Sequence, residues 1–285
     1  MSSTSEALSG RVALVTGANT GIGLVTARAL CRQGAHVVIA CRSPERAAPA
    51  AEEIAAAGAE SGGKVDVLAL DLGDFASVRA CAQALLDRGL PLHLLINNAG
   101  MAGTRGMTRS GFELAFGVNH VGHFLLTQLL LPRIRSSAPA RIVTVASKAH
   151  LRVTGIDWQA VRERTKTVTG VPEYGVSKLA NVLFSAELSR KLAGSGVTTY
   201  SLHPGVIASD VWRAVPWPFR SLMKLGMLSV EEGAATTLHC ATNEAAGKET
   251  GLYYDQCKVR EPSKLAQDAA LAAELWKRSE AWVAT

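Results

Sequence analysis

The sequence predicts an α/β fold in which a doubly wound parallel sheet carries helices on both faces. Two observations predict it: short apolar segments alternate with helical patterns through the first two-thirds of the chain, and a glycine-rich loop joins the first strand to the first helix. Parallel strands need such crossovers, and strands buried on both faces read as continuous apolar runs. The pattern is typical of a single-domain Rossmann-type fold. The expected strands are Arg11–Thr16, His36–Cys41, Val65–Asp71, Leu92–Ile96, Arg141–Ser147 and Val197–His203.

The glycine-rich loop lies between the first strand and a helix expected over 22–33. Glycines let the backbone turn sharply there, and the free N–H groups and dipole at the start of a helix favour an anion. The spacing G-x-x-x-G-x-G differs from G-x-G-x-x-G, and no Lys-Ser/Thr follows as in a P-loop. We expect this loop to bind a dinucleotide. The candidate contacts are Gly17, Asn19, Thr20, Gly21, Ile22 and Gly23.

Helical patterns fill the intervals between the expected strands. The second helix is expected to begin at Ser43-Pro44, where a hydroxyl can cap the helix and proline fits its first position. Pro49 is unfavourable inside this helix, so a later start is the alternative. The other expected helices span 74–88, 111–133 and 173–193. We expect a polar N-terminal segment over 1–10 and a single domain over 11–285.

Composition argues against several classes of function. The net charge of +6 comes from 30 basic against 24 acidic residues that are scattered along the chain, so we expect no nucleic-acid partner. Five cysteines without a C-x-x-C pair indicate reduced thiols and a cytoplasmic location. Residues 1–10 are polar and no apolar run reaches the roughly 18 residues of a membrane span, so we expect no signal peptide or anchor. The histidines lack metal-ligand spacing and no G-x-S-x-G motif is present, so we expect neither a metal site nor a hydrolase triad.

Polar residues that could carry chemistry fall where this fold places its ligand, beyond the carboxyl ends of the strands. Asn97-Asn98-Ala99-Gly100 follows the fourth strand, and Ser147 ends the fifth. Tyr174 and Lys178 are i and i+4, so their side chains emerge from one face of a helix. Asn119 lies in the helix between the fourth and fifth strands.

A phenol and an amine in this arrangement can exchange a proton with a substrate oxygen. A nearby ammonium favours the phenolate and lowers the phenol pKa from about 10, so Tyr174 can act as acid and base. The Ser147 hydroxyl can hold the same oxygen, and Asn119 can hold Lys178 through a water. Each residue also has a structural alternative, as a solvated helix pair, a strand-end cap or a backbone-satisfying amide.

The order of these motifs resembles the short-chain dehydrogenase/reductase family over nearly the whole chain. The matching elements are the T-G-x-x-x-G-I-G loop, Asp71-Leu72, the N-N-A-G motif, Asn119, Ser147, the Y-x-x-x-K motif and Pro204-Gly205. The resemblance implies a catalytic tetrad of Asn119, Ser147, Tyr174 and Lys178, with Tyr174 as acid/base and Lys178 also holding the nicotinamide ribose. It implies that Asp71 and Leu72 flank the adenine. It further implies cofactor contacts from Asn98, Ala99, Gly100, Pro204, Gly205 and Ser209.

Finer motifs resemble the retinol dehydrogenase and WW-domain oxidoreductase branch of that family. They are Ala40-Cys41-Arg42, the run Val118-Asn119-His120-Val121-Gly122-His123-Phe124-Leu125-Leu126-Thr127, Ser177-Lys178-Leu179-Ala180-Asn181 and Tyr253-Tyr254-Asp255-Gln256-Cys257-Lys258. Light-dependent protochlorophyllide reductases share part of the pattern, so reduction of a double bond in a tetrapyrrole is an alternative function. A non-catalytic NADPH-responsive binding protein is another. The resemblance leaves a monomer and a homodimer open.

The end of the second strand predicts the cofactor. No acidic residue there can accept hydrogen bonds from a ribose 2′-OH, whereas an arginine matches a 2′-phosphate. We therefore expect NADP(H), with Arg42 as the main contact and Arg46 as a second candidate. Because NADPH is normally held reduced in cells, carbonyl reduction is the expected direction.

Residues 206–228 are expected to cover the substrate. They combine aromatic and aliphatic side chains with Arg213, Arg220 and Lys224. An apolar lining suits a lipophilic aldehyde, ketone or alcohol. Basic and aromatic residues together also suit peripheral contact with a membrane, and ordinary core packing is the structural alternative.

Overall fold

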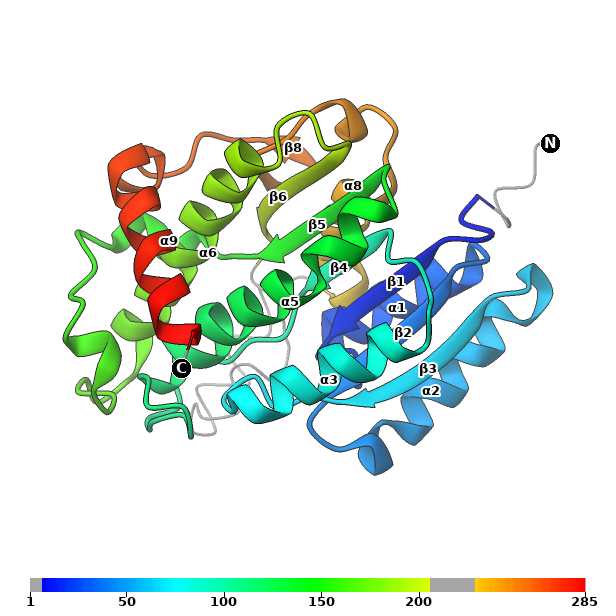
Figure 1. Cartoon of the computed structure of the whole chain (residues 1–285), viewed down its shortest axis with the longest axis horizontal. Helices are drawn as coiled ribbons and strands as arrows, with labels where there is room; N and C mark the ends of the chain where they lie inside the picture. Colours follow the sequence, from blue (N-terminus) through cyan, green and yellow to red (C-terminus); the bar gives the residue numbers. More distant parts are fainter. Residues whose placement is uncertain (1–6, 206–228, 285) are drawn as a thin grey trace.

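The computed structural model describes residues 7–205 and 229–284 (Figure 1). They build one α/β domain around an eight-stranded sheet of order β3-β2-β1-β4-β5-β6-β7-β8. All neighbouring strands are parallel except the last pair, which is antiparallel. The predicted fold class is confirmed. The strands are β1 (Val12–Thr16), β2 (His36–Cys41), β3 (Lys64–Ala69), β4 (Leu94–Asn97), β5 (Ala140–Val145), β6 (Val197–His203), β7 (Leu252–Asp255) and β8 (Lys258–Val259).

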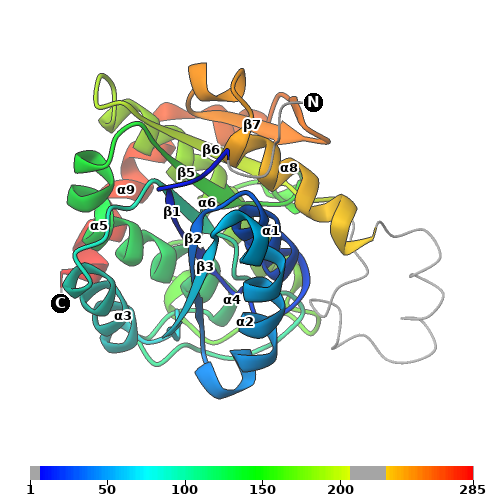
Figure 2. The ribbon, with the colours of Figure 1, turned by 90° about the vertical axis from the view of Figure 1, so that its right-hand side faces the viewer.

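Helices cover both faces of the sheet, and Figures 1 and 2 show them as two layers with the sheet between. One buried apolar cluster joins the sheet to α3, α5, α6 and α9, and a second joins its other face to α1, α2 and α8. The helices are α1 (Gly21–Arg32), α2 (Pro44–Gly58), α3 (Phe75–Asp87), α4 (Leu114–Phe116), α5 (Gly122–Ser136), α6 (Val171–Lys191), α8 (Val230–Thr242) and α9 (Ala269–Val283). Parallel strands between two helical layers bring their carboxyl ends to one edge, where this fold places its ligand.

All six predicted strands are present, with ends shifted by at most two residues. The sequence did not predict β7 and β8. The start of α2 predicted at Ser43-Pro44 is confirmed, since Ser43 accepts a hydrogen bond from the Arg46 amide. The alternative of a later start is wrong, and Pro49 lies inside the helix. The helix thus tolerates the loss of one backbone donor.

The helix predicted over 111–133 is interrupted. Gly111 has φ +79°, which a helix does not allow, and the helical run begins at Leu114 after Glu113 caps it. A π-helical turn over Gly117–Val121 then joins α4 to α5. The stretch Leu114–Ser136 is long and apolar enough, by length and composition, to cross a membrane, and it is mostly buried inside the protein as the central helix of one layer.

Candidate active site

The loop between β1 and α1 has the open geometry of an anion-binding helix start. A Cβ on Gly17, whose φ is +66°, would lie 2.9 Å from Cα of Ala99, and a Cβ on Gly23 would lie 2.5 Å from the Gly17 carbonyl oxygen. Both positions therefore exclude a side chain. Gly21 has φ +60° and open space where its Cβ would be. The Thr20 side chain makes no capping hydrogen bond and the first turn of α1 has no acidic residue, so the site fits the phosphates of a dinucleotide.

The segment after β4 is tied to this loop by Asn98. Its side-chain Nδ2 donates to the Thr16 carbonyl oxygen at 2.8 Å. The Thr16 hydroxyl accepts hydrogen bonds from the backbone amides of Asn98 at 3.0 Å and Ala99 at 2.9 Å. Asn98 thus holds two loops together, and Ala99 and Gly100 follow at the same edge of the sheet.

Ser147 and Tyr174 meet beyond the end of β5. The Ser147 hydroxyl caps the short helix that follows by accepting from the Ala149 amide at 3.2 Å. Burial raises the pKa of Tyr174, and a hydrogen bond from Ser147 opposes the rise. The expected lowering of the phenol pKa by Lys178 is not found: the shift is upward, and loss of water around the phenol is its largest cause. Ser147 acts both as a cap and as a partner of the phenol.

Lys178 is 3% exposed, and its amine is fixed at the end of β5. Its Nζ donates to the Val145 carbonyl oxygen at 2.8 Å and lies 5.6 Å from the centroid of the Tyr174 ring. Burial lowers the pKa of Lys178 to about 7. The amine can therefore exist in both protonation states near neutral pH.

Asn119 is fully buried within the π-helical turn. Its Oδ1 accepts from the Met101 amide at 2.9 Å, and its Nδ2 donates to the Met101 carbonyl at 3.0 Å and to the Ser177 hydroxyl at 2.9 Å. We expected Asn119 to hold Lys178 through a water. The structure gives the side-chain amide direct partners on the segment after β4 and on α6, next to Lys178. The water bridge to Lys178 stays a prediction.

Gly100 lies where these groups converge. A Cβ on Gly100 would lie 3.4 Å from both Asn119 Oδ1 and Lys178 Nζ. The four residues expected to form a tetrad thus come from the end of β5, the π turn and one face of α6. Two of them, Asn119 and Lys178, lie beside Gly100, where a side chain would crowd both polar atoms.

The residues expected around the adenosine half lie at the same edge. Arg42 follows β2 directly and is exposed, as is Arg46, and neither guanidinium forms an ion pair within 7–205 or 229–284. The Asp71 carboxylate accepts from the Gly73 amide at 2.9 Å, which shapes the turn after β3, and Leu72 is buried. Gly205, with φ +97°, follows Pro204 beyond β6. The expected cofactor contact Ser209 and the expected substrate segment 206–228 lie outside the described residues.

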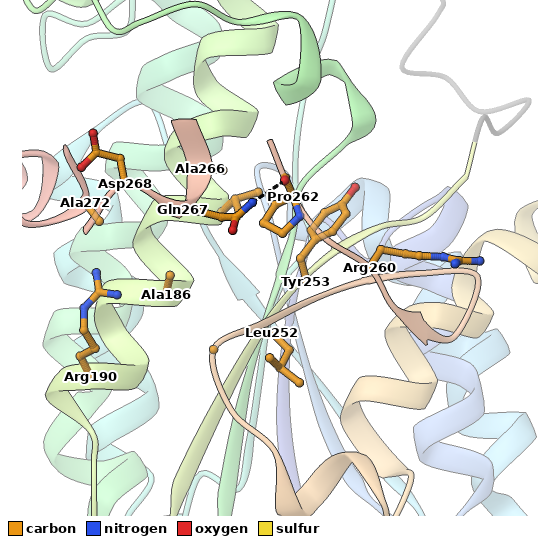
Figure 3. Close-up of a pocket in the computed structure, with 12 residues that line it drawn as sticks. Ala186, Arg190, Leu252, Tyr253, Arg260, Pro262, Ala266, Gln267, Asp268 and Ala272 are labelled. Carbon is orange, nitrogen blue, oxygen red and sulfur yellow. Dashed lines mark hydrogen bonds between the residues drawn. The ribbon is translucent and has the colours of Figure 1, made fainter. Parts of the chain in front are cut away.

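A cavity of about 250 Å³ lies elsewhere, along the second half of α6 (Figure 3). It is lined by Ala186 and Arg190 of α6, by Leu252 and Tyr253 of β7, and by residues at the start of α9. None of the four tetrad residues lines it. No group of three or more histidine, cysteine, aspartate or glutamate side chains in the described part of the chain could hold a metal ion.

Sequence reasoning missed several residues that support the site. Ser177 binds Asn119, and His123 and His150 bond to the backbone carbonyls of Asn119 and Ser147. From the sequence we expect no metal ligation by the histidines, and neither of these two is assigned a role in the site. Their positions, four residues after Asn119 and three after Ser147, are the signal that could have found them, since such spacing brings a side chain back to a carbonyl of the preceding turn.

The chain matches known proteins along most of its length. A family profile described as short chain dehydrogenase matches residues 11–217. Retinol dehydrogenase 12 of Mus musculus is 44% identical over 284 residues, which cover 97% of this chain and 87% of that protein. The WW domain-containing oxidoreductase of Gallus gallus is 39% identical over 285 residues, which cover 96% of this chain and 68% of that protein.

Solved structures show the same architecture. A crystal structure of an uncharacterised protein from Mycobacterium paratuberculosis superposes with a TM-score of 0.76 at 34% identity, covering 98% of this chain and 95% of that one. A Pseudomonas aeruginosa RhlG/NADP active-site complex superposes with a TM-score of 0.69 at 28% identity, covering 88% and 96%. These matches confirm the resemblance inferred from the sequence motifs.

Proposed function

This chain belongs to the short-chain dehydrogenase/reductase family and acts as an oxidoreductase of CH–OH and C=O groups; within that activity we propose that it is an NADP(H)-dependent enzyme that interconverts lipophilic aldehydes or ketones and alcohols, working mainly as a carbonyl reductase. The relatives named retinol dehydrogenase and the complex of RhlG with NADP support this proposal. It rests most on one observation, the buried amine of Lys178 that is fixed at the end of β5 and lies 5.6 Å from the centroid of the Tyr174 ring.

The protonation state of Tyr174 suits the role of acid in carbonyl reduction. Burial raises the pKa of this phenol, so Tyr174 carries its proton at neutral pH. A protonated phenol can donate to the oxygen of a carbonyl as that oxygen becomes an alkoxide. The Ser147 hydroxyl, already in hydrogen-bond contact with the phenol, can hold the same oxygen in place. Tyr174 is thus the acid in reduction and the base in oxidation.

The surrounding residues hold and orient the reactants. When bound, a nicotinamide dinucleotide supplies or accepts the hydride. The start of α1 would hold its phosphates, Lys178 its nicotinamide ribose, and Asp71 and Leu72 its adenine. Because burial lowers its pKa to about 7, the Lys178 amine can take up or release a proton near neutral pH, and it lies beside Tyr174.

Selection of NADP(H) is proposed to rest on Arg42. This residue is exposed at the end of β2 and has no ion-pair partner among the described residues, so its guanidinium is free to bind a 2′-phosphate. Arg46, in the first turn of α2, is a second candidate contact. A lipophilic substrate, contact of 206–228 with a membrane and a cytoplasmic location remain predictions from the sequence.

Consumption of NADPH by the purified protein tests the proposal. The carbonyl panel runs from short aldehydes through retinal to steroid ketones, with Tyr174→Phe beside the wild type and Tyr200→Phe as a matched control. Tyr200 bonds to Thr198 and Ala246 on the opposite face of the sheet. We expect turnover that increases with substrate lipophilicity, and a loss of at least about 100-fold in Tyr174→Phe.

Binding of NADPH, followed by its fluorescence, separates catalysis from binding. We expect Tyr174→Phe to bind NADPH as the wild type does and Tyr200→Phe to keep its turnover. Tight NADPH binding without turnover of any carbonyl would contradict the reductase proposal and favour a binding protein. Equal turnover by Tyr174→Phe and the wild type would remove Tyr174 from the mechanism.

A further inference from the structure

His123 makes two hydrogen bonds that join separate parts of the candidate active site. It lies in the first turn of α5 and is 1% exposed. Its Nδ1 is 3.0 Å from the backbone carbonyl oxygen of Asn119, and its Nε2 is 2.8 Å from the Thr16 hydroxyl. Thr16 is the last residue of β1, 107 positions from His123 in the sequence. One imidazole therefore links the end of the first strand to the turn that carries Asn119.

The partners of His123 define where its proton lies. A carbonyl oxygen can only accept, so Nδ1 carries the hydrogen and Nε2 is the acceptor. The Thr16 hydroxyl already accepts from the amides of Asn98 and Ala99, so its single hydrogen is donated. Nε2 lies 2.8 Å from this hydroxyl and the Ile96 carbonyl oxygen lies 3.4 Å from it, so Nε2 is the nearer acceptor. Every group in this network then has the donor or acceptor role that its chemistry allows. Burial holds the pKa of His123 at about 4, so the ring is neutral at physiological pH.

Asn119 lies in a π-helical turn, and its backbone carbonyl oxygen bonds to a histidine side chain. In a π turn the backbone bonds run from i to i+5, and here the Gly122 amide donates to the Gly117 carbonyl. In an α-helix each carbonyl oxygen instead pairs with the amide four residues later. The residue four positions after Asn119 is His123, and its side chain donates to the Asn119 carbonyl. π turns inside helices are frequent at functional sites.

We propose that His123 is a positioning residue of the active site, whose Nδ1–H fixes the backbone carbonyl of Asn119, while the bond between Nε2 and Thr16 selects that tautomer. It acts through Asn119, which in turn bonds to Met101 and to Ser177 beside Lys178. The proposal rests on the proposed function for its effect on turnover. The hydrogen-bond network on which it depends is independent of that function.

Two substitutions separate the two bonds of His123. Asparagine places an N–H donor where Nδ1 lies, so His123→Asn keeps the bond to the Asn119 carbonyl. Glutamine places an oxygen near the position of Nε2, so His123→Gln keeps only the bond to Thr16. The matched control is His120→Gln, since His120 is buried three residues earlier and its Nε2 bonds to Ser279 on α9.

Turnover and KM of the purified variants with NADPH and the best carbonyl give the first test. We expect His123→Gln to lower kcat by about 10- to 100-fold with little change in NADPH affinity, because a small displacement of a supporting group suffices for such a loss. His123→Asn should stay within about threefold of the wild type, and so should His120→Gln. Equal kcat losses in His123→Asn and His123→Gln would overturn the proposal, because they would indicate a general packing defect.

A second measurement does not need turnover. Nitrogen-15 spectra of histidine-labelled protein report the tautomer, and amide hydrogen exchange reports the stability of residues 117–121. We expect the Nδ1–H tautomer at His123, and exchange in the π turn that is faster in His123→Gln than in His123→Asn. An Nε2–H tautomer or unchanged exchange would overturn the positioning role. A wild type that reduces no carbonyl but shows the expected spectra would overturn only the proposed function.

Discussion

The amine of Lys178 lies 2.8 Å from the carbonyl oxygen of Val145, the last residue of β5. The same oxygen accepts a second hydrogen bond, at 3.1 Å, from Nδ2 of Asn181. The end of the strand therefore fixes two successive turns of α6. It also holds a buried amine beside Tyr174, at the cost of removing that amine from water.

We expect Lys178→Met to stabilise the protein and abolish its activity. The substitution removes an amine that burial disfavours in its charged form, and Val145 keeps Asn181 as a donor, so no buried acceptor loses its last partner. Between pH 7 and 10.5 the unfolded chain binds a proton at Lys178 that the folded chain lacks, so this residue makes wild-type stability rise with pH. The free energy of unfolding should increase by about 2 kcal/mol near pH 7, and the gain should shrink toward pH 10.

Urea unfolding of the variant and wild type from pH 6 to 9.5 checks this expectation. Lys277→Met, an exposed change on α9, is the control and should leave the free energy of unfolding unchanged. A Lys178→Met protein that is less stable than the wild type at pH 7 would mean that the amine contributes more through its hydrogen bond than burial costs.

Cofactor preference should depend on Arg42. We expect Arg42→Ala to weaken NADPH binding by about 10- to 100-fold and to leave NADH binding unchanged, because only NADPH carries the 2′-phosphate. Arg46→Ala, a matched change four residues on, should have a smaller effect. Dissociation constants from NADPH and NADH fluorescence give the measurement. An unchanged ratio of the two constants in Arg42→Ala would remove this residue from cofactor selection.

Alanine substitutions at two glycines with similar backbone conformations should lower stability alike but change NADPH affinity differently. Gly21 and Gly62 have φ +60° and +70°, and at both the space for a Cβ is open. Each alanine should therefore lower the free energy of unfolding by about 1 kcal/mol through left-handed strain. Only Gly21→Ala places a methyl group at the start of α1, so only this variant should lose NADPH affinity. Equal NADPH affinity in both variants would argue against dinucleotide binding at that helix.

The turn between β7 and β8 contains two strained residues. Gln256 and Cys257 have φ +51° and +58°, where type I′ hairpins favour Asn-Gly. The double change Gln256→Asn with Cys257→Gly should raise the free energy of unfolding by about 1 kcal/mol, because asparagine and glycine adopt positive φ with less strain. The backbone amide at position 257 can keep its bond to Thr236 in this variant. Thermal unfolding measures the gain. Gln256→Val should lower the midpoint, and a stabilising effect of valine would contradict the strain.

Local sequence patterns predicted the elements whose signals lie within the element or next to its ends. The first six strands and the starts of α1 and α6 follow from apolar runs, glycines and caps that act within a few residues. The four residues of β7 follow Gly251 and form a strand through pairing with β6, so no long apolar run marked them. The π turn likewise carries no sequence signal apart from the apolar helix around it.

The sequence by itself determined the fold class, the glycine-rich loop and the placement of Tyr174 and Lys178 on one helical face, because each depends on neighbours along the chain. Only the tertiary structure decided that Asn119 bonds to Ser177, 58 positions away, and that His123 bonds to Thr16, 107 positions away. It also decided that burial raises the pKa of Tyr174 and lowers that of Lys178. Hydrogen-bond partners and the loss of water both depend on segments that come together only when the chain folds.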